Sequence, residues 1–178
     1  LTVSVGQLQN SSTGIQLLMG TGTSYSVAGN AGTNQVPQRW AFSDTIQNIY
    51  ASNKTVTLSY TWSVSGSSPS GTFELQLNGT PWTTLGNWIT ISSNNTGGTV
   101  SQTTTLSGIT SSVSATGIQL RMDNVPTGIT LTISKMKLET GSVATNWCLS
   151  PQEQLTSTNS YAGLTINSSG LTQVAGSM

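Results

Sequence analysis

Tryptophan and arginine are the side chains of this chain with the most distinctive binding chemistry. An indole ring offers a wide apolar face that can stack on the C–H bonds of a sugar ring, and a guanidinium group donates hydrogen bonds to hydroxyl or phosphate oxygens. Several of these residues follow turn-like sequences, and an apolar ring exposed on a loop suggests a binding partner. We therefore predict a saccharide-binding set made of Trp40, Trp82, Trp88, Arg39, Tyr25 and Arg121.

Each of these residues also has a purely structural interpretation. The loop tryptophans could fold back and close one end of a β-sandwich. Arg121 could pair with Asp123 in a surface ion pair, which contributes little stability. Tyr60 and Trp62 differ from the set, because they fall on the apolar face of a regular strand pattern and are expected in the core.

Catalysis has little support in the sequence. The chain has no histidine, which removes Ser-His-Asp and Cys-His arrangements and imidazole zinc ligands, and its single cysteine cannot form an intrachain disulfide. Glycoside hydrolysis needs only two carboxylates, yet none of the five lies in a recognisable acid/base context. They are Asp44, Glu74, Asp123, Glu139 and Glu153. We predict a protein that is not an enzyme and has no cofactor.

A structural calcium ion remains an open alternative. Asp44, Asp123 and Asn124 could supply oxygen ligands, although the sequence has no D-x-D-x-D-like cluster. The simpler interpretation is that these residues stabilise turns.

The charge content limits the range of partners. Charged residues make up 6% of the chain, against about 25% in ordinary domains, and the formal net charge is zero. Nucleic acid and anionic membrane surfaces are therefore poor partners, because both are bound through clustered positive charge. No apolar run of about 18 residues is present to span a membrane. A neutral glycan is compatible with such a surface.

Alternating apolar and hydroxyl residues predict an all-β fold. Residues 55–64 alternate strictly, as do residues 73–77, 117–122 and 128–133, and Asn78-Gly79 is a strong turn signal. The alternation changes register after Ser134, which predicts a β-bulge or a strand that leaves one sheet for the other. We expect a long loop over residues 23–38 and find no 11-residue helical pattern.

Two stretches carry a resemblance to a known family. Residues 135–151 contain Lys137-Leu138-Glu139-Thr140-Gly141, then Ala144-Thr145-Asn146-Trp147, then Pro151. This order resembles the KLExG…ATxW…P motif that closes carbohydrate-binding-module-like jelly-roll domains in tail proteins of bacteriophages of Gram-positive hosts. Residues 15–22, with Gln16 in place of asparagine, resemble the NLLxGT opening of the same domains.

The resemblance implies a jelly-roll β-sandwich of two antiparallel sheets over residues 15–151. Residues 1–14 would then be a linker or flanking strand, and residues 152–178 a C-terminal extension or a linker to a parent protein. In the family the tryptophan of the motif covers the sandwich, so Trp147 is expected to be structural, as is Glu139.

The resemblance also implies a function. We expect a non-catalytic carbohydrate-binding module of a phage tail protein, located in the virion tail and acting at the host cell surface. Its partners would be a bacterial cell-wall polysaccharide and the parent tail protein. Two alternatives remain: a structural decoration that mediates protein–protein contacts in the tail, and a binding module of a secreted glycosidase or adhesin.

Overall fold

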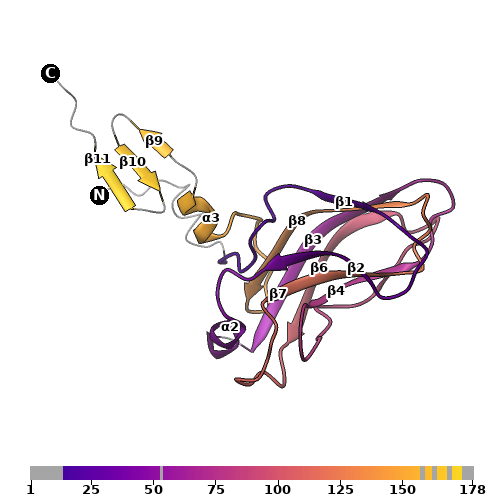
Figure 1. The fold of residues 1–178 in the computed structure, drawn as a ribbon, viewed down its shortest axis with the longest axis horizontal. Helices are drawn as coiled ribbons and strands as arrows, with labels where there is room; N and C mark the ends of the chain where they lie inside the picture. The colour runs from indigo at the N-terminus through magenta and orange to yellow at the C-terminus, as the bar shows by residue number, and fades with distance from the viewer. Residues whose placement is uncertain (1–13, 53, 157–158, 162–163, 168–169, 174–178) are drawn as a thin grey trace.

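Two four-stranded antiparallel sheets form the protein's main body, a β-sandwich (Figure 1). The structure is a computed structural model that describes residues 14–52, 54–156, 159–161, 164–167 and 170–173. One sheet has the order β1-β8-β3-β6 and the other β2-β7-β4-β5. Their strands are β1 (Tyr25–Ala28), β2 (Gln35–Ala41), β3 (Thr55–Ser65), β4 (Thr72–Leu77), β5 (Ile89–Thr90), β6 (Gly97–Thr105), β7 (Gly117–Asp123) and β8 (Thr130–Thr140). Successive strands alternate between the sheets except for β4 and β5, which are neighbours in one sheet. This is the jelly-roll arrangement, and the predicted all-β sandwich is confirmed.

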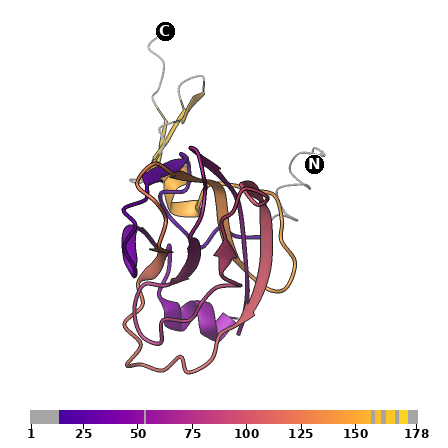
Figure 2. The same cartoon turned by 90° about the vertical axis from the view of Figure 1, so that its right-hand side faces the viewer.

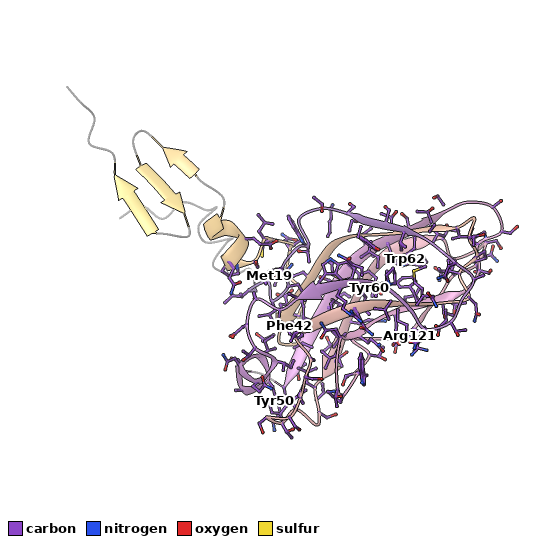
Figure 3. All side chains as sticks on the ribbon, in the orientation of Figure 1. Met19, Phe42, Tyr50, Tyr60, Trp62 and Arg121 are labelled. Carbon is purple, nitrogen blue, oxygen red and sulfur yellow. The ribbon has the colours of Figure 1, made fainter. Side chains whose placement is uncertain are left out.

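The inward-facing side chains of both sheets make one core. β3 places Val56, Leu58, Tyr60 and Trp62 on its inner face, as its alternation predicted. Phe73 of β4 packs edge-on against two of these rings, with ring centroids 6.4 Å from Tyr60 and 5.2 Å from Trp62. Both labelled rings lie in the interior (Figure 3). This aromatic contact joins the two sheets across the sandwich.

The expected change of register in β8 is also present. The pairing of β8 with β3 shifts between Ser59 and Thr61, and Lys135 has a φ of 49° at that point. This irregularity acts as a bulge, so that Ile133 and Met136 both face the core although they are three positions apart, an odd spacing that would put them on opposite faces of a regular strand. The predicted bulge is therefore confirmed.

One expectation about local structure was wrong. Residues 23–38 are not one long loop, because β1 and the start of β2 lie within them and pair with β8 and β7. A short helix, α2 (Ile46–Ser52), lies at one end of the sandwich (Figure 2). Seven residues are too few to produce the periodic pattern that was sought, but Thr45 caps the helix by accepting a hydrogen bond from the amide of Asn48.

Residues 141–150, which we call the strap, cross the outer face of the β1-β8-β3-β6 sheet. Thr57 and Thr103 on that face donate hydrogen bonds to the carbonyls of Gly141 and Ser142. Beneath the strap Lys137 and Glu139, which also point outward from β8, are 0% and 1% exposed. The strap therefore covers the charged pair of the sequence motif.

The C-terminal part contains α3 (Pro151–Thr156) and a separate three-stranded sheet. Its order is β11-β10-β9, with strands β9 (Asn159–Tyr161), β10 (Leu164–Asn167) and β11 (Gly170–Gln173). The expected linker at residues 1–14 lies outside the described residues except for Gly14. None of the described helices is long and apolar enough to cross a membrane.

Candidate functional site

The outer face of the β2-β7-β4-β5 sheet carries a group of polar side chains that have little exposure. Strand pairing sets Gln119 of β7 opposite Gln76 of β4 and opposite Arg39 of β2, and it sets Arg121 opposite Glu74. Glu74, Gln76 and Gln119 are only 2%, 6% and 2% exposed. Polar side chains on an outer sheet face are normally solvated, so this burial marks a place that other parts of the chain enclose.

Arg121 holds two carboxylates together at one end of this face. Its guanidinium lies 3.0 Å from the carboxylate of Asp123 and 3.8 Å from that of Glu74. Glu74 also accepts a hydrogen bond of 2.6 Å from Thr84, and Asp123 accepts one from the backbone amide of Asn34. The predicted pairing of Arg121 with Asp123 is present, as part of a larger cluster.

Trp88 lies over this charged cluster. The guanidinium carbon of Arg121 is 5.1 Å from the centre of the Trp88 ring, a cation–π contact. The turn before it is fixed by Gly86, whose φ of 108° suits glycine, and by Gln102, which accepts a 2.7 Å hydrogen bond from the amide of Asn87. Trp88 is 39% exposed, so part of its ring remains open to solvent.

Trp82 lies on the same face, beyond the end of β4. It is 50% exposed and belongs to a turn in which its amide donates a 2.7 Å hydrogen bond to the carbonyl of Gly79. Its ring borders a cleft of about 350 Å³ on the sheet. The cleft is lined by Asn34, Val36, Arg39, Gln76, Trp82, Gln119 and Arg121.

Four of the six predicted binding residues therefore share one face. Arg39, Trp82 and Arg121 line the cleft, and Trp88 stacks on Arg121 at its side. Arg39 is exposed and donates through Nε to the side-chain oxygen of Gln119, 3.3 Å away.

Trp40 and Tyr25 lie elsewhere. Trp40 is in β2, not in a loop, and is 4% exposed within the core, so the expectation of an exposed loop ring was wrong. Tyr25 of β1 is half-buried and packs edge-on against Trp40 at 5.9 Å, while its hydroxyl donates to the carbonyl of Pro37. Burial raises the pKa of the Tyr25 hydroxyl above its usual value. This contact joins β1 of one sheet to β2 of the other, so both rings belong to the packing between the sheets.

Two binding-face residues were not predicted from the sequence. Gln76 and Gln119 occupy the polar positions of two alternating strands, so the sequence pattern gave no signal that set them apart. On a solvated sheet face such residues would be unremarkable, so only the enclosure by Trp82 and the arginines distinguishes them.

The acidic residues are distributed over separate places. Asp44 lies before α2, where it accepts hydrogen bonds from Thr45 and Asn48, whereas Asp123 lies in the Arg121 cluster. No group of three metal-binding side chains occurs among the described residues.

A larger cleft of about 530 Å³ lies beside α2, but none of the predicted binding residues lines it. The Arg39–Trp82 cleft is therefore the better candidate site.

Comparison with known proteins gives a likeness in fold. No family model matches the chain, and no curated protein matches it. A similar solved structure is the tripod (BppUct-A-L) from the baseplate of bacteriophage Tuc2009, with a TM-score of 0.50 and 17% sequence identity. The match covers 79% of this chain and 60% of that chain. At this identity the likeness establishes a shared fold.

Proposed function

We propose that the protein is a non-catalytic carbohydrate-binding module of a phage tail protein that recognises host cell-wall polysaccharide. The observation that carries the proposal is the cleft on the outer sheet face, where exposed Trp82 adjoins Arg39 and two enclosed glutamines. An indole beside directed hydrogen-bonding groups is what a sugar ring requires, since one face of the ring is apolar and its edge carries hydroxyls.

The charge arrangement supports binding rather than catalysis. Both carboxylates of the site, Glu74 and Asp123, contact the single guanidinium of Arg121. Hydrolysis by two carboxylates would require one on each side of the scissile bond, with one as acid and the other as base or nucleophile. Here both carboxylates instead hold the guanidinium of Arg121 in place, and that group lies against the ring of Trp88.

The tail location rests on two independent supports. The motif at residues 135–151 resembles that of phage tail domains, and the structural neighbour is part of a phage baseplate. A shallow cleft on one module should bind weakly, with a Kd in roughly the micromolar to millimolar range. Repeated display on a virion would raise the overall affinity through avidity.

Labelling of Gram-positive cells by a fluorescent fusion protein tests the proposal, with extracted wall polysaccharide as competitor. Trp82→Ala and Trp88→Ala should each weaken binding by about ten- to a hundredfold, or roughly 1.5–3 kcal/mol, because a stacking ring is lost. Trp147→Ala is the matched control, since Trp147 is 37% exposed but lies in the strap. Unchanged labelling by Trp82→Ala and Trp88→Ala would reject this site.

Protein–protein docking is a second candidate, favoured by a different surface. Ile15 and Val143 are 65% and 70% exposed, and they belong to the N-terminal segment and the strap, which hydrogen bonds join through Gly14 and Thr145. Exposed apolar side chains of this size are typical of contact surfaces. Sedimentation that reveals association of the protein, reduced by Val143→Ser and unchanged by Trp82→Ala, would support this alternative.

A further inference from the structure

The cleft contains a pair of neighbouring carboxamides with unused hydrogen-bonding capacity. Gln76 and Gln119 are directly opposite each other on β4 and β7. The oxygen of Gln119 accepts from Arg39, which leaves its NH₂ group to donate. Gln76 is 6% exposed, yet its side chain makes no hydrogen bond with any other described residue. Among the described residues the buried side-chain nitrogen without a partner is Arg121 Nε, so the Gln76 amide still reaches the surface of the cleft and is open to a ligand that enters it.

We infer that the ligand of this cleft is an N-acetylated sugar, whose acetamido group lies between the two glutamines. A secondary amide needs one acceptor for its N–H and one donor for its C=O. The Gln76 oxygen can supply the acceptor, and the Gln119 NH₂ group can supply the donor. The methyl group of the acetamido substituent would contact the apolar surface of Trp82 and Val36, which line the same cleft.

The charges at the site favour an uncharged ligand. Arg121 is neutralised by Glu74 and Asp123, so an acidic sugar placed over the cluster would meet two carboxylates for one cation. Arg39 lies at the other side of the cleft, where its position is fixed by Gln119. Its terminal N–H groups can donate to neutral hydroxyls of the same sugar.

This inference rests on the proposed function, and chemical treatment of one ligand separates the two. Wall polysaccharide from a labelled strain would be de-N-acetylated, and a portion then re-N-acetylated with acetic anhydride. The module should bind the untreated polymer, bind the de-N-acetylated polymer about tenfold or more weakly, and regain affinity for the re-acetylated polymer. Failure to bind the untreated polymer would instead count against the proposed function itself.

A variant of Gln76 tests whether its carboxamide distinguishes acetylated from de-N-acetylated polymer. Gln76→Leu keeps the approximate volume but removes both hydrogen-bonding groups, so the affinity ratio of acetylated to de-N-acetylated polymer should fall towards one. Gln47→Leu, on α2 and outside the cleft, is the control and should preserve the ratio. Circular dichroism and thermal melting would establish that both variants are folded.

Two results would overturn the inference while leaving carbohydrate binding intact. One is equal affinity for the native and de-N-acetylated polymers. The other is binding only to polymers that carry phosphate or carboxylate groups, with the affinity lost in Arg39→Gln; that outcome would identify Arg39 as an anion site instead.

Discussion

The outer faces of the two sheets both carry polar side chains, but these side chains are covered and hydrogen-bonded on one face and open to a cleft on the other. On the β1-β8-β3-β6 sheet, Lys137 donates to Thr145 at 2.5 Å and to the carbonyl of Asn146 at 2.9 Å, and Glu139 accepts from the amide and the hydroxyl of Thr145, both at 2.7 Å. On the β2-β7-β4-β5 sheet, the side chain of Gln76 has no such partner among the described residues, and Trp82 and Trp88 are exposed. The strap closes the first face and leaves its hydrogen bonds satisfied, whereas the second face remains open.

This difference explains what the sequence motif does. Lys137, Glu139 and Thr145 are three of the residues that define the motif, and they bind each other where the strap crosses the sheet. Gly14 completes the contact, because its amide donates to Thr145 and a Cβ at this position would collide with Glu139. The motif therefore specifies closure of the sandwich, and binding is assigned to residues outside it.

The largest predicted effect comes from breaking the closed face. Glu139→Ala would leave Lys137 buried and unpaired, which we expect to cost about 3–5 kcal/mol of the free energy of unfolding. For a chain of this size that corresponds to a decrease in Tm of roughly 10 °C. Thermal and urea unfolding would measure it.

Lys135→Ala is the control for that change, since Lys135 is exposed on the same strand. Its unfolding free energy should change by less than about 0.5 kcal/mol. If Glu139→Ala and Lys135→Ala have equally small effects, the strap does not close the face as described.

Substitution of Arg121 on the open face should have a smaller effect on stability than Glu139→Ala, and it should also weaken polysaccharide binding. Arg121→Met removes the partner of Glu74 and should cost about 1–3 kcal/mol, while Arg121→Lys should recover part of it by keeping the charge. Neither variant keeps the planar group beneath Trp88, so both should bind polysaccharide more weakly. Urea unfolding and competition binding would separate the two quantities; recovery of full binding by Arg121→Lys would contradict the positioning role of the guanidinium.

The layers of the fold could be predicted from sequence because burial leaves a regular pattern. The alternation in residues 55–64 identified β3, and the register change after Ser134 identified the bulge in β8. Residues 23–38 gave no such pattern, since many small and polar residues there form strands only through pairing with β7 and β8. Trp40 was misjudged for the same reason.

The site was predictable only in part because enclosure is a tertiary property. Trp82 and Trp88 could be identified by the turns that precede them, and both are exposed. The alignment of β2, β7 and β4 decides which other residues share that face, and it brings together Arg39, Gln76 and Gln119. The sequence around a single polar residue does not reveal this strand register.

The smallest predicted effect concerns the core that separates the two faces. Burial raises the pKa of Tyr60 well above its usual value, so the folded protein keeps this hydroxyl protonated at a pH where the unfolded chain ionises it. Above about pH 10 the unfolded state therefore binds fewer protons than the folded state. The free energy of unfolding should be unaffected by Tyr60 below that pH and should decrease above it, by at most about 1.4 kcal/mol per pH unit. Tyr60→Phe should show a shallower decrease between pH 10 and pH 11 in urea unfolding, whereas other groups that titrate there affect both proteins alike. Polysaccharide binding at neutral pH should not change in Tyr60→Phe, because Tyr60 is 3% exposed and lies on neither outer face. If the two proteins lose stability with pH at equal slopes, Tyr60 ionises as readily in the folded protein as in the unfolded chain.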